Sequence, residues 1–194
     1  ANTHTTSSIT GLQSTCFRHE ARQLVAEAVN AKVTGRGAED VVLFTGSGCT
    51  AAVNKLVTVL GLHLPLACAD EQRPVVFVGP YEHHSNLLPW RESSAEMVAI
   101  PEGADGVGLD RAALAAALRR YAGRPLKVGA FSAASNITGV CERVDEVTVL
   151  LHRHGALAVW DYATAAPYVR LDMNPRSSGG DGGVSSEDAA LLYK

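Results

Sequence analysis

The sequence is short of lysine and of paired cysteines, and both shortages exclude classes of site. Its 194 residues include four lysines, and the thirteen arginines are scattered rather than clustered. With a formal charge of −3, the chain has no positive field of the kind that attracts nucleic acid. The four cysteines lie far apart without a Cys-x-x-Cys pair, which disfavours a zinc knuckle or a redox pair. We therefore expect no nucleic-acid partner, no metal site and reduced thiols.

Long apolar runs are missing as well. No run approaches the length of a membrane span, and the start, ANTHTTSSIT, lacks the charged and apolar regions of a secretory signal. The hydrophobic share of 46% is typical of a globular domain with one core. These features predict a soluble, cytoplasmic protein without a membrane partner, and they leave open an organellar location after removal of a targeting segment.

Short apolar runs alternate with helical patterns along most of the chain. A first helix is expected over residues 16–32. After it, strands are expected at residues 40–45, 74–78, 97–100, 126–131 and 156–160, and helices at 50–62, 85–92, 109–121 and 144–154. Continuously apolar strands between helices predict a three-layer α/β/α sandwich with a mainly parallel sheet, which binds ligands at the carboxyl ends of its strands. Residues 176–187 read as a flexible Gly/Ser-rich insertion, and residues 188–194 as the start of another strand.

A glycine turn follows the strand expected at residues 40–45 and opens the next helix. Its sequence, GSGCTAAVN, runs from Gly46 to Asn54. The backbone N–H groups and the Thr50 hydroxyl can bind a phosphate at the positive end of a helix. The turn lacks the third glycine of a dinucleotide fingerprint and the Gly-Lys-Ser/Thr of a triphosphate loop, so a purely structural turn is the alternative.

Two further polar motifs follow predicted strands. His83 and His84 could serve as a base or as a ring stacked on a flat cofactor, whereas adjacent histidines rarely bind one metal ion; a structural histidine is the alternative. Asp161 ends an apolar strand, where a carboxylate needs a cation or strong donors. A protonated pyridine nitrogen is one such cation, and a helix-capping or loop acid is the alternative.

The order of these motifs is more informative than any one of them. The glycine turn is followed by E-H-H-S-N-x-x-P-W at residues 82–90, then by Ser135-Asn136-x-x-Gly139, and then by Asp161. This series resembles the class V aminotransferases and cysteine desulfurases, which are pyridoxal 5'-phosphate (PLP) enzymes of fold type I. The opening ANTHTTSSITG is similar to an Asn-x-His stretch near their amino-terminal end, so the resemblance spans most of residues 1–175.

The resemblance implies a role for each matching residue, and all of these roles are expectations. Gly48, Cys49 and Thr50 would lie at the PLP phosphate, with Cys49 where the family usually has threonine. The predicted catalytic residues are His83, stacked on the pyridine ring, and Asp161, paired with the pyridine nitrogen. Asn136 would lie near the ring substituents. Thr164 occupies a place where desulfurases commonly have glutamine, and this difference weakens the case for a standard desulfurase.

The largest departure from the family is the lysine that carries the cofactor. Lys32, Lys55 and Lys127 are in the wrong places, and Lys194, the remaining candidate, lacks the preceding Ser-x-His. We therefore expect the chain as given to be inactive. The resemblance also predicts that residues 1–175 are part of a PLP-binding large domain and that the small domain is absent.

The resemblance implies that the complete enzyme acts on an amino acid, as a transferase or lyase and as a homodimer. One alternative is a non-catalytic relative, or an isolated fragment, that serves as a binding or dimerisation module. The other is a nucleotide-binding α/β domain, which would leave His83, Asn136 and Asp161 unexplained.

Overall fold

The structure, a computed structural model, describes residues 4–175. These residues form two compact units, one from residues 4–44 and 170–175 and the other from residues 45–169. The predicted insertion at 176–187 and the predicted strand at 188–194 lie outside the described residues. The expectation that residues 1–175 belong to one large domain stays a prediction.

The first unit contains one helix, α1 (Ile9–Ala28). It begins earlier than the predicted residue 16, because the Ser8 hydroxyl caps it by accepting a hydrogen bond from the Gly11 N–H. The chain leaves the helix at Asn30, whose φ of 52° is left-handed. The helix therefore also ends before residue 32, its predicted last residue.

The strand predicted at residues 40–45 is wrong, because the structure has no strand there. A strand needs a hydrogen-bonding neighbour, and none of the described residues pairs with this segment. Asp40 instead accepts hydrogen bonds from the Lys32 N–H at 2.7 Å and from Asn174 Nδ2 at 2.6 Å. The apolar side chains of Val41, Leu43 and Phe44 are exposed.

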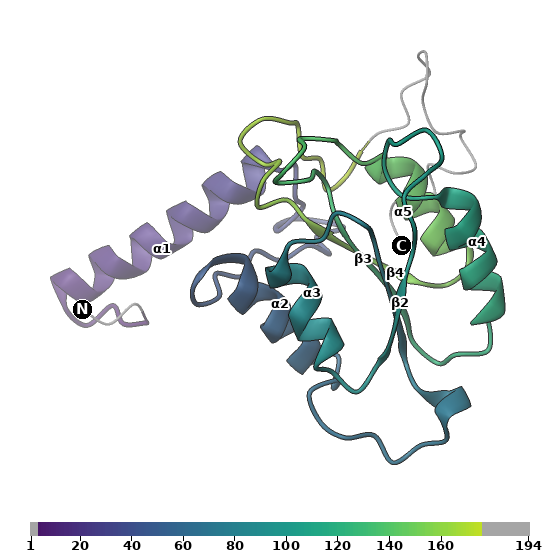
Figure 1. Cartoon of the computed structure of the whole chain (residues 1–194). Coiled ribbons are helices and arrows are strands. Elements are labelled where there is room, and N and C mark those ends of the chain that lie inside the picture. The colour runs from purple at the N-terminus through teal and green to yellow at the C-terminus, as the bar shows by residue number, and fades with distance from the viewer. Residues whose placement is uncertain (1–3, 176–194) are drawn as a thin grey trace. The chain divides into compact units, whose positions relative to one another are not determined.

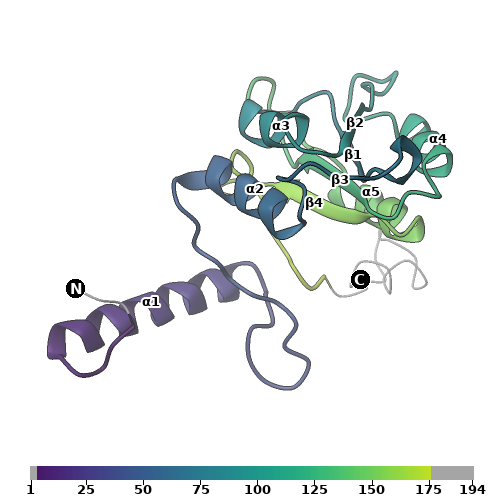
Figure 2. The same ribbon diagram turned by 90° about the horizontal axis from the view of Figure 1, so that it is seen from below.

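The second unit is built on a four-stranded sheet. Its strands are β1 (Val75–Val78), β2 (Glu96–Ala99), β3 (Lys127–Ser132) and β4 (Leu157–Asp161). They lie in the order β2-β1-β3-β4, which can be followed in Figure 2, and every neighbouring pair is parallel. The predicted parallel sheet is confirmed.

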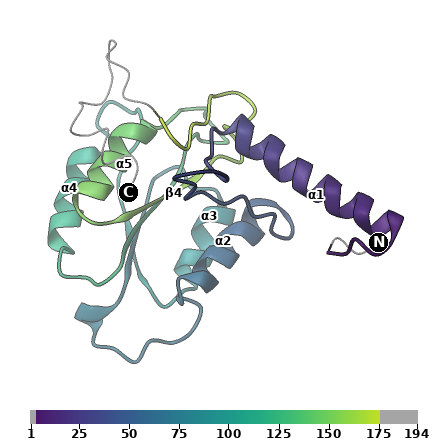
Figure 3. The same ribbon diagram turned by 180° about the vertical axis from the view of Figure 1, so that it is seen from behind.

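Helices cover both faces of this sheet. Helices α2 (Gly48–Val59) and α3 (His84–Arg91) lie on one face, and α4 (Arg111–Arg120) and α5 (Val144–Arg153) on the other (Figures 1 and 3). A short 3₁₀ helix spans Asp70–Gln72. The predicted α/β/α layers are confirmed, with helix ends shifted by a few residues. For example, Asp110 caps α4 by accepting from the N–H groups of Ala112 and Ala113.

Side chains at alternate strand positions pack into two separate cores. Phe77 and Phe131 point to the α4 and α5 face, where they pack with Leu114 and Leu151. The residues one position away, such as Val76, Val78, Val128 and Ala130, pack on the α2 and α3 face. Because side chains alternate along a strand, Ser132 and Asp161 share the face of Val128, Ala130 and Val159. These two polar residues therefore lie at the carboxyl end of the sheet, on the side of α2 and α3.

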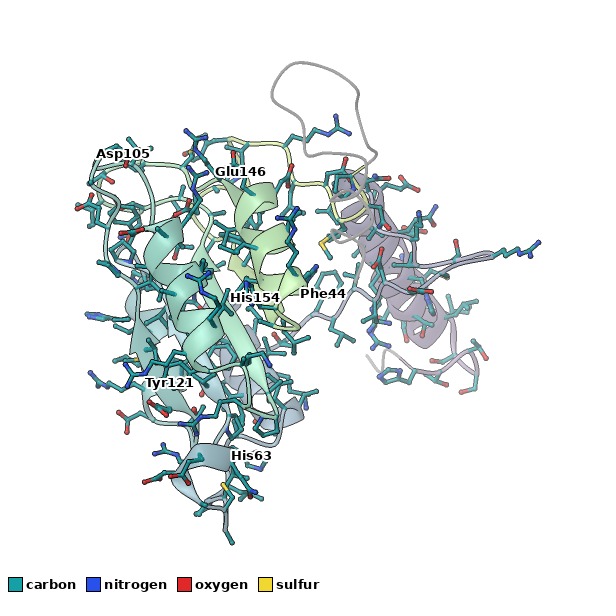
Figure 4. The ribbon with its side chains drawn as sticks, turned by 90° about the vertical axis from the view of Figure 1, so that its right-hand side faces the viewer. Phe44, His63, Asp105, Tyr121, Glu146 and His154 are labelled. Atoms are coloured by element: carbon teal, nitrogen blue, oxygen red, sulfur yellow. The ribbon has the colours of Figure 1, made fainter. Side chains whose placement is uncertain are left out.

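The opposite end of the sheet carries a polar cluster of its own. Tyr121, just past α4, donates to Glu96 at 2.6 Å, and Arg124 forms an ion pair with the same carboxylate at 2.5 Å. Figure 4 shows Tyr121 far along α4 from Asp105 and Glu146, which lie near the carboxyl end of the strands. This cluster joins the edge strand β2 to the end of α4, away from the residues singled out in the sequence.

Candidate functional site

A cavity of about 240 Å³ lies at the carboxyl end of the sheet. It brings together five of the predicted site residues: Cys49, His83, Asn136, Asp161 and Thr164. The remaining lining residues are Ser85, Ser132, Ala134 and Ala163. Gly48 and Thr50 are not in this lining. Residues from four separate stretches of sequence thus meet at one place because parallel strands all end at the same edge.

Strand register places two of these residues side by side. Ser132 ends β3, Asp161 ends β4, and the two are partners across the parallel pair. The Asp161 backbone oxygen accepts from the Ala133 N–H at 2.9 Å, which extends the ladder by one bond. One Asp161 side-chain oxygen, Oδ1, accepts from the Ala163 N–H at 2.8 Å. This bond turns the chain back so that Ala163 and Thr164 also line the cavity.

The His83 ring is held by the first turn of α3. His83 is the N-cap of that helix, and its Nδ1 accepts from the Ser85 N–H at 3.1 Å. The Ser85 Oγ lies 3.0 Å from the same nitrogen and accepts from the Thr50 hydroxyl at 2.9 Å. Since Nδ1 is the acceptor, the neutral ring carries its proton on Nε2. The ring is thus fixed in one tautomer at the cavity wall.

The start of α2 provides the opposite wall. Gly46 and Gly48 have φ values of 40° and 71°, which glycine adopts more readily than other residues. Ser47 caps the helix without a side-chain hydrogen bond, so its own side chain leaves the first N–H groups of α2 open. Such an end favours an anion. Thr50 faces a separate groove of about 420 Å³, which Asn54, His84 and Ser85 also line.

Cys49 lies against Asp161. Burial raises the pKa of the Cys49 thiol to about 12, and a hydrogen bond to the Asp161 carboxylate and its negative charge act in the same direction. The thiol therefore stays protonated at neutral pH and donates to the carboxylate. A second groove of about 420 Å³ shares Cys49, Asp161 and Ala163 with the cavity. The space around Asp161 is thus larger than the cavity alone.

The segment Ser135 to Gly139 forms a tight turn that presents Asn136. The buried Ser135 hydroxyl oxygen accepts from the N–H groups of Ile137 and Thr138 at 3.3 and 3.2 Å. Gly139 has a φ of 73°, which closes the turn. Because Ser135 stabilises the backbone, the neighbouring Asn136 amide is available to the cavity. The motif residues thus divide into one that builds the turn and one that faces the site.

Three residues at the site were given no role from the sequence, although Glu82 and Ser85 belong to the motif at residues 82–90. Ser85 and Ser132 line the cavity, and Glu82 lies behind it with hydrogen bonds to Ser132 and Asn86. Serines are common in loops, so type and spacing alone gave no signal. The register of β3 against β4 is what identifies Ser132.

Within residues 4–175, no group of three or more His, Cys, Asp or Glu side chains is arranged to hold a metal ion. Within the same range, no helix is both long and apolar enough to cross a membrane.

Comparison with known proteins identifies the family of this chain. The model of the aminotransferase class-V family matches residues 1–177. The chain belongs to this family. Among its relatives in the class V family, a probable cysteine desulfurase of Halalkalibacterium halodurans is 27% identical over 79% of this chain and 35% of its own length. A probable cysteine desulfurase of Pyrococcus abyssi is 31% identical over the same shares.

A solved structure supports the fold of this class V chain. The apo structure of a cysteine desulfurase from Thermococcus onnurineus matches with a TM-score of 0.67 and 26% identity. That match covers 89% of this chain and 40% of the other. The class V chain thus spans well under half the length of these relatives. Lys194, the remaining candidate for the cofactor-bearing lysine, lies outside the described residues.

Proposed function

We propose that this chain supplies the PLP-binding part of an enzyme that acts on an amino acid, as a cysteine desulfurase or a related lyase. One observation carries the proposal. His83, Asn136 and Asp161, far apart in the sequence, line one cavity in a chain of the class V family. The homodimer and the cytoplasmic location stay predictions that go with this proposal.

The residues at the cavity fit the chemical groups of PLP. The Asp161 carboxylate can hold a protonated pyridine nitrogen, because it accepts hydrogen bonds from the Ala163 N–H and from the Cys49 thiol, a weak donor, and carries a negative charge. The His83 ring offers a flat surface on the cavity wall, and the Asn136 amide can bond ring substituents. The open end of α2, with Cys49 in its first turn, suits a phosphate. We keep the Thr50 hydroxyl as a phosphate ligand in this proposal, although it donates to Ser85.

These residues have distinct tasks in the proposed reaction. When bound, PLP draws electrons away from the α carbon of an amino-acid substrate. Asp161 would keep the cofactor ring electron-poor by holding a proton at the pyridine nitrogen. His83, with Nε2 as its donor atom, orients the ring and can hold a proton at that nitrogen. Thr164 and Asn136 limit the space on the other side.

A non-catalytic binding module stays the second candidate, and one observation favours it. Of the residues that the structure describes, no lysine lines the cavity, and Lys127 donates to the Arg124 backbone oxygen at 3.2 Å from the other end of β3. Binding of PLP without turnover by the complete protein, which the leading proposal expects to be active, would support this candidate.

The test is equilibrium binding of PLP to the purified protein and to Asp161→Ala. Asp70→Ala is the matched control, because the Asp70 side chain is 88% exposed and lies outside the cavity lining. We expect saturable binding that Asp161→Ala weakens by about tenfold or more, the value of one charge-assisted hydrogen bond, while Asp70→Ala binds normally. Binding that is absent, or equal in both variants and the wild type, would refute the proposal.

A further inference from the structure

Glu82 is a partly buried carboxylate that takes no part in the chemistry proposed above. Its Oε1 accepts from the Gly79 N–H at 3.3 Å and from the Ser132 N–H at 3.0 Å. Its Oε2 accepts from the Ser132 hydroxyl at 2.8 Å and from Asn86 Nδ2 at 2.7 Å. Among the described residues, no cation pairs with it. Four hydrogen-bond donors surround a carboxylate that has no ion-pair partner among the described residues, which indicates a specific structural role rather than that of a surface acid.

The carboxylate joins segments that are distant in the sequence. Gly79 follows β1, Asn86 lies in α3 and Ser132 ends β3. The position of Gly79 belongs to the same arrangement, because a Cβ there would meet Glu82 Oε1 at 3.0 Å. Asn86 is completely buried and also accepts from Trp90 Nε1 at 3.2 Å. Glu82 therefore fixes the turn between β1 and α3 against the end of β3.

His83, the next residue in the chain, lies on this turn. Its ring is oriented by Ser85, but its backbone is placed by the anchor at Glu82. The distance between the His83 ring and the end of β4 thus depends on the hydrogen bonds between Glu82 and β3.

Ser132 forms the other link to the cavity. Its hydroxyl proton is directed to Glu82, so the oxygen can only accept hydrogen bonds from a group in the cavity. Asp161, its partner across the strands, presents a second acceptor on the same face. Two acceptors side by side suit a cationic N–H donor. If the Ser132 hydroxyl proton pointed into the cavity instead, it would repel that donor.

We propose that Glu82 is a positioning residue of this site: its carboxylate places His83 and directs the Ser132 hydroxyl so that the cavity wall beside Asp161 accepts hydrogen bonds. This inference rests on the proposed function for its ligand, a protonated heteroaromatic ring such as that of PLP. It assigns a role to Glu82 and Ser132 that the binding residues alone do not require.

The test compares Glu82→Gln with wild type, and Glu92→Gln is the control because Glu92 is an exposed acid at the end of α3. Glutamine keeps the shape, but its NH₂ group faces the Ser132 hydroxyl and turns it into a donor toward the cavity. We expect the dissociation constant for PLP to rise about tenfold. In the protein without PLP, the His83 ring signal in a ¹H–¹⁵N spectrum should shift, while that of His84 stays in place. Glu92→Gln should change neither quantity.

Ser132→Ala removes the link from Glu82 to the cavity wall and leaves the link to His83 in place. It is also the variant to measure if Glu82→Gln does not fold. It should raise the dissociation constant for PLP several-fold while the His83 signal stays in place. An unchanged dissociation constant in folded Glu82→Gln, or in Ser132→Ala, would overturn the inference, and so would an unmoved His83 signal in Glu82→Gln. If the wild type failed to bind PLP, the proposed function would fall, and the His83 signal would still test Glu82.

Discussion

Ser132 and Asp161 are register partners at the carboxyl ends of β3 and β4, and both line the same cavity. Twenty-nine residues apart in the sequence, they are adjacent because the two strands are parallel and in direct contact. Ser132 is held from behind by Glu82, and Asp161 by the Ala163 N–H and the Cys49 thiol. The site is thus organised around one pair of strand ends, and substitutions there should have separable effects.

Asp161→Asn should impair chemistry more than binding in the complete enzyme proposed here. The amide keeps the shape and a hydrogen bond, but it gives no charge to keep a pyridine nitrogen protonated. Loss of a charge-assisted hydrogen bond is worth roughly 1.5–3 kcal/mol. We expect a fall in turnover of about ten- to a hundredfold or more at saturating PLP and substrate. Unchanged turnover would identify Asp161 as a structural acid.

His83→Ala and His84→Ala form a matched pair of neighbouring substitutions. His83 lines the cavity, whereas His84 faces the groove that contains Thr50. Loss of the His83 ring removes a stacking surface, so PLP should dissociate faster, by roughly tenfold for a contact worth about 1–1.5 kcal/mol. His84→Ala should release PLP at the wild-type rate. Stopped-flow measurement of PLP release checks this, and equal rates for the two variants would contradict the stacking role.

Much of the fold could be predicted from the sequence because its signals are local. The runs at residues 74–78 and 126–131 are apolar apart from Lys127, which is typical of strands covered on both faces. The segment 40–45 looked the same, yet it forms no strand, because a partner strand is a non-local requirement that composition does not encode. Val41 and Phe44 are 72% and 56% exposed instead.

The candidate site could be predicted in part. His83, Asn136 and Asp161 were identified by the order of their motifs, and the structure brings all three to one cavity. Thr50 was expected to face it as well, but its hydroxyl donates to Ser85 and it lines a neighbouring groove. The pairing of Glu82, the first residue of the motif at 82–90, with Ser132 could not be predicted, because it depends on β1 and β3 lying side by side.

Gly129→Ala should destabilise the second unit. A Cβ at this position in β3 would lie 2.6 and 2.7 Å from the two terminal methyl groups of Leu151 and 2.8 Å from Phe131. Such overpacking in a dense core costs roughly 1–3 kcal/mol. Gly123→Ala is the control, because nothing lies within 4 Å of a Cβ there. Urea unfolding should show a lower free energy of unfolding for Gly129→Ala only; equal values for both variants would contradict the packing seen here.

The Cys49 thiol should resist alkylation until the pH is far above neutral. Burial and the Asp161 carboxylate raise the pKa of Cys49 to about 12, and only the thiolate reacts. The rate of iodoacetamide labelling of Cys49, followed peptide by peptide with mass spectrometry, should therefore rise up to about pH 12 while the protein stays folded. Cys141 is exposed and serves as the internal control for reagent reactivity. Asp161→Asn removes the negative charge, so it should lower the pKa of Cys49 and speed its labelling at pH 9. A Cys49 profile that coincides with that of Cys141 would show that the thiol does not lie against Asp161.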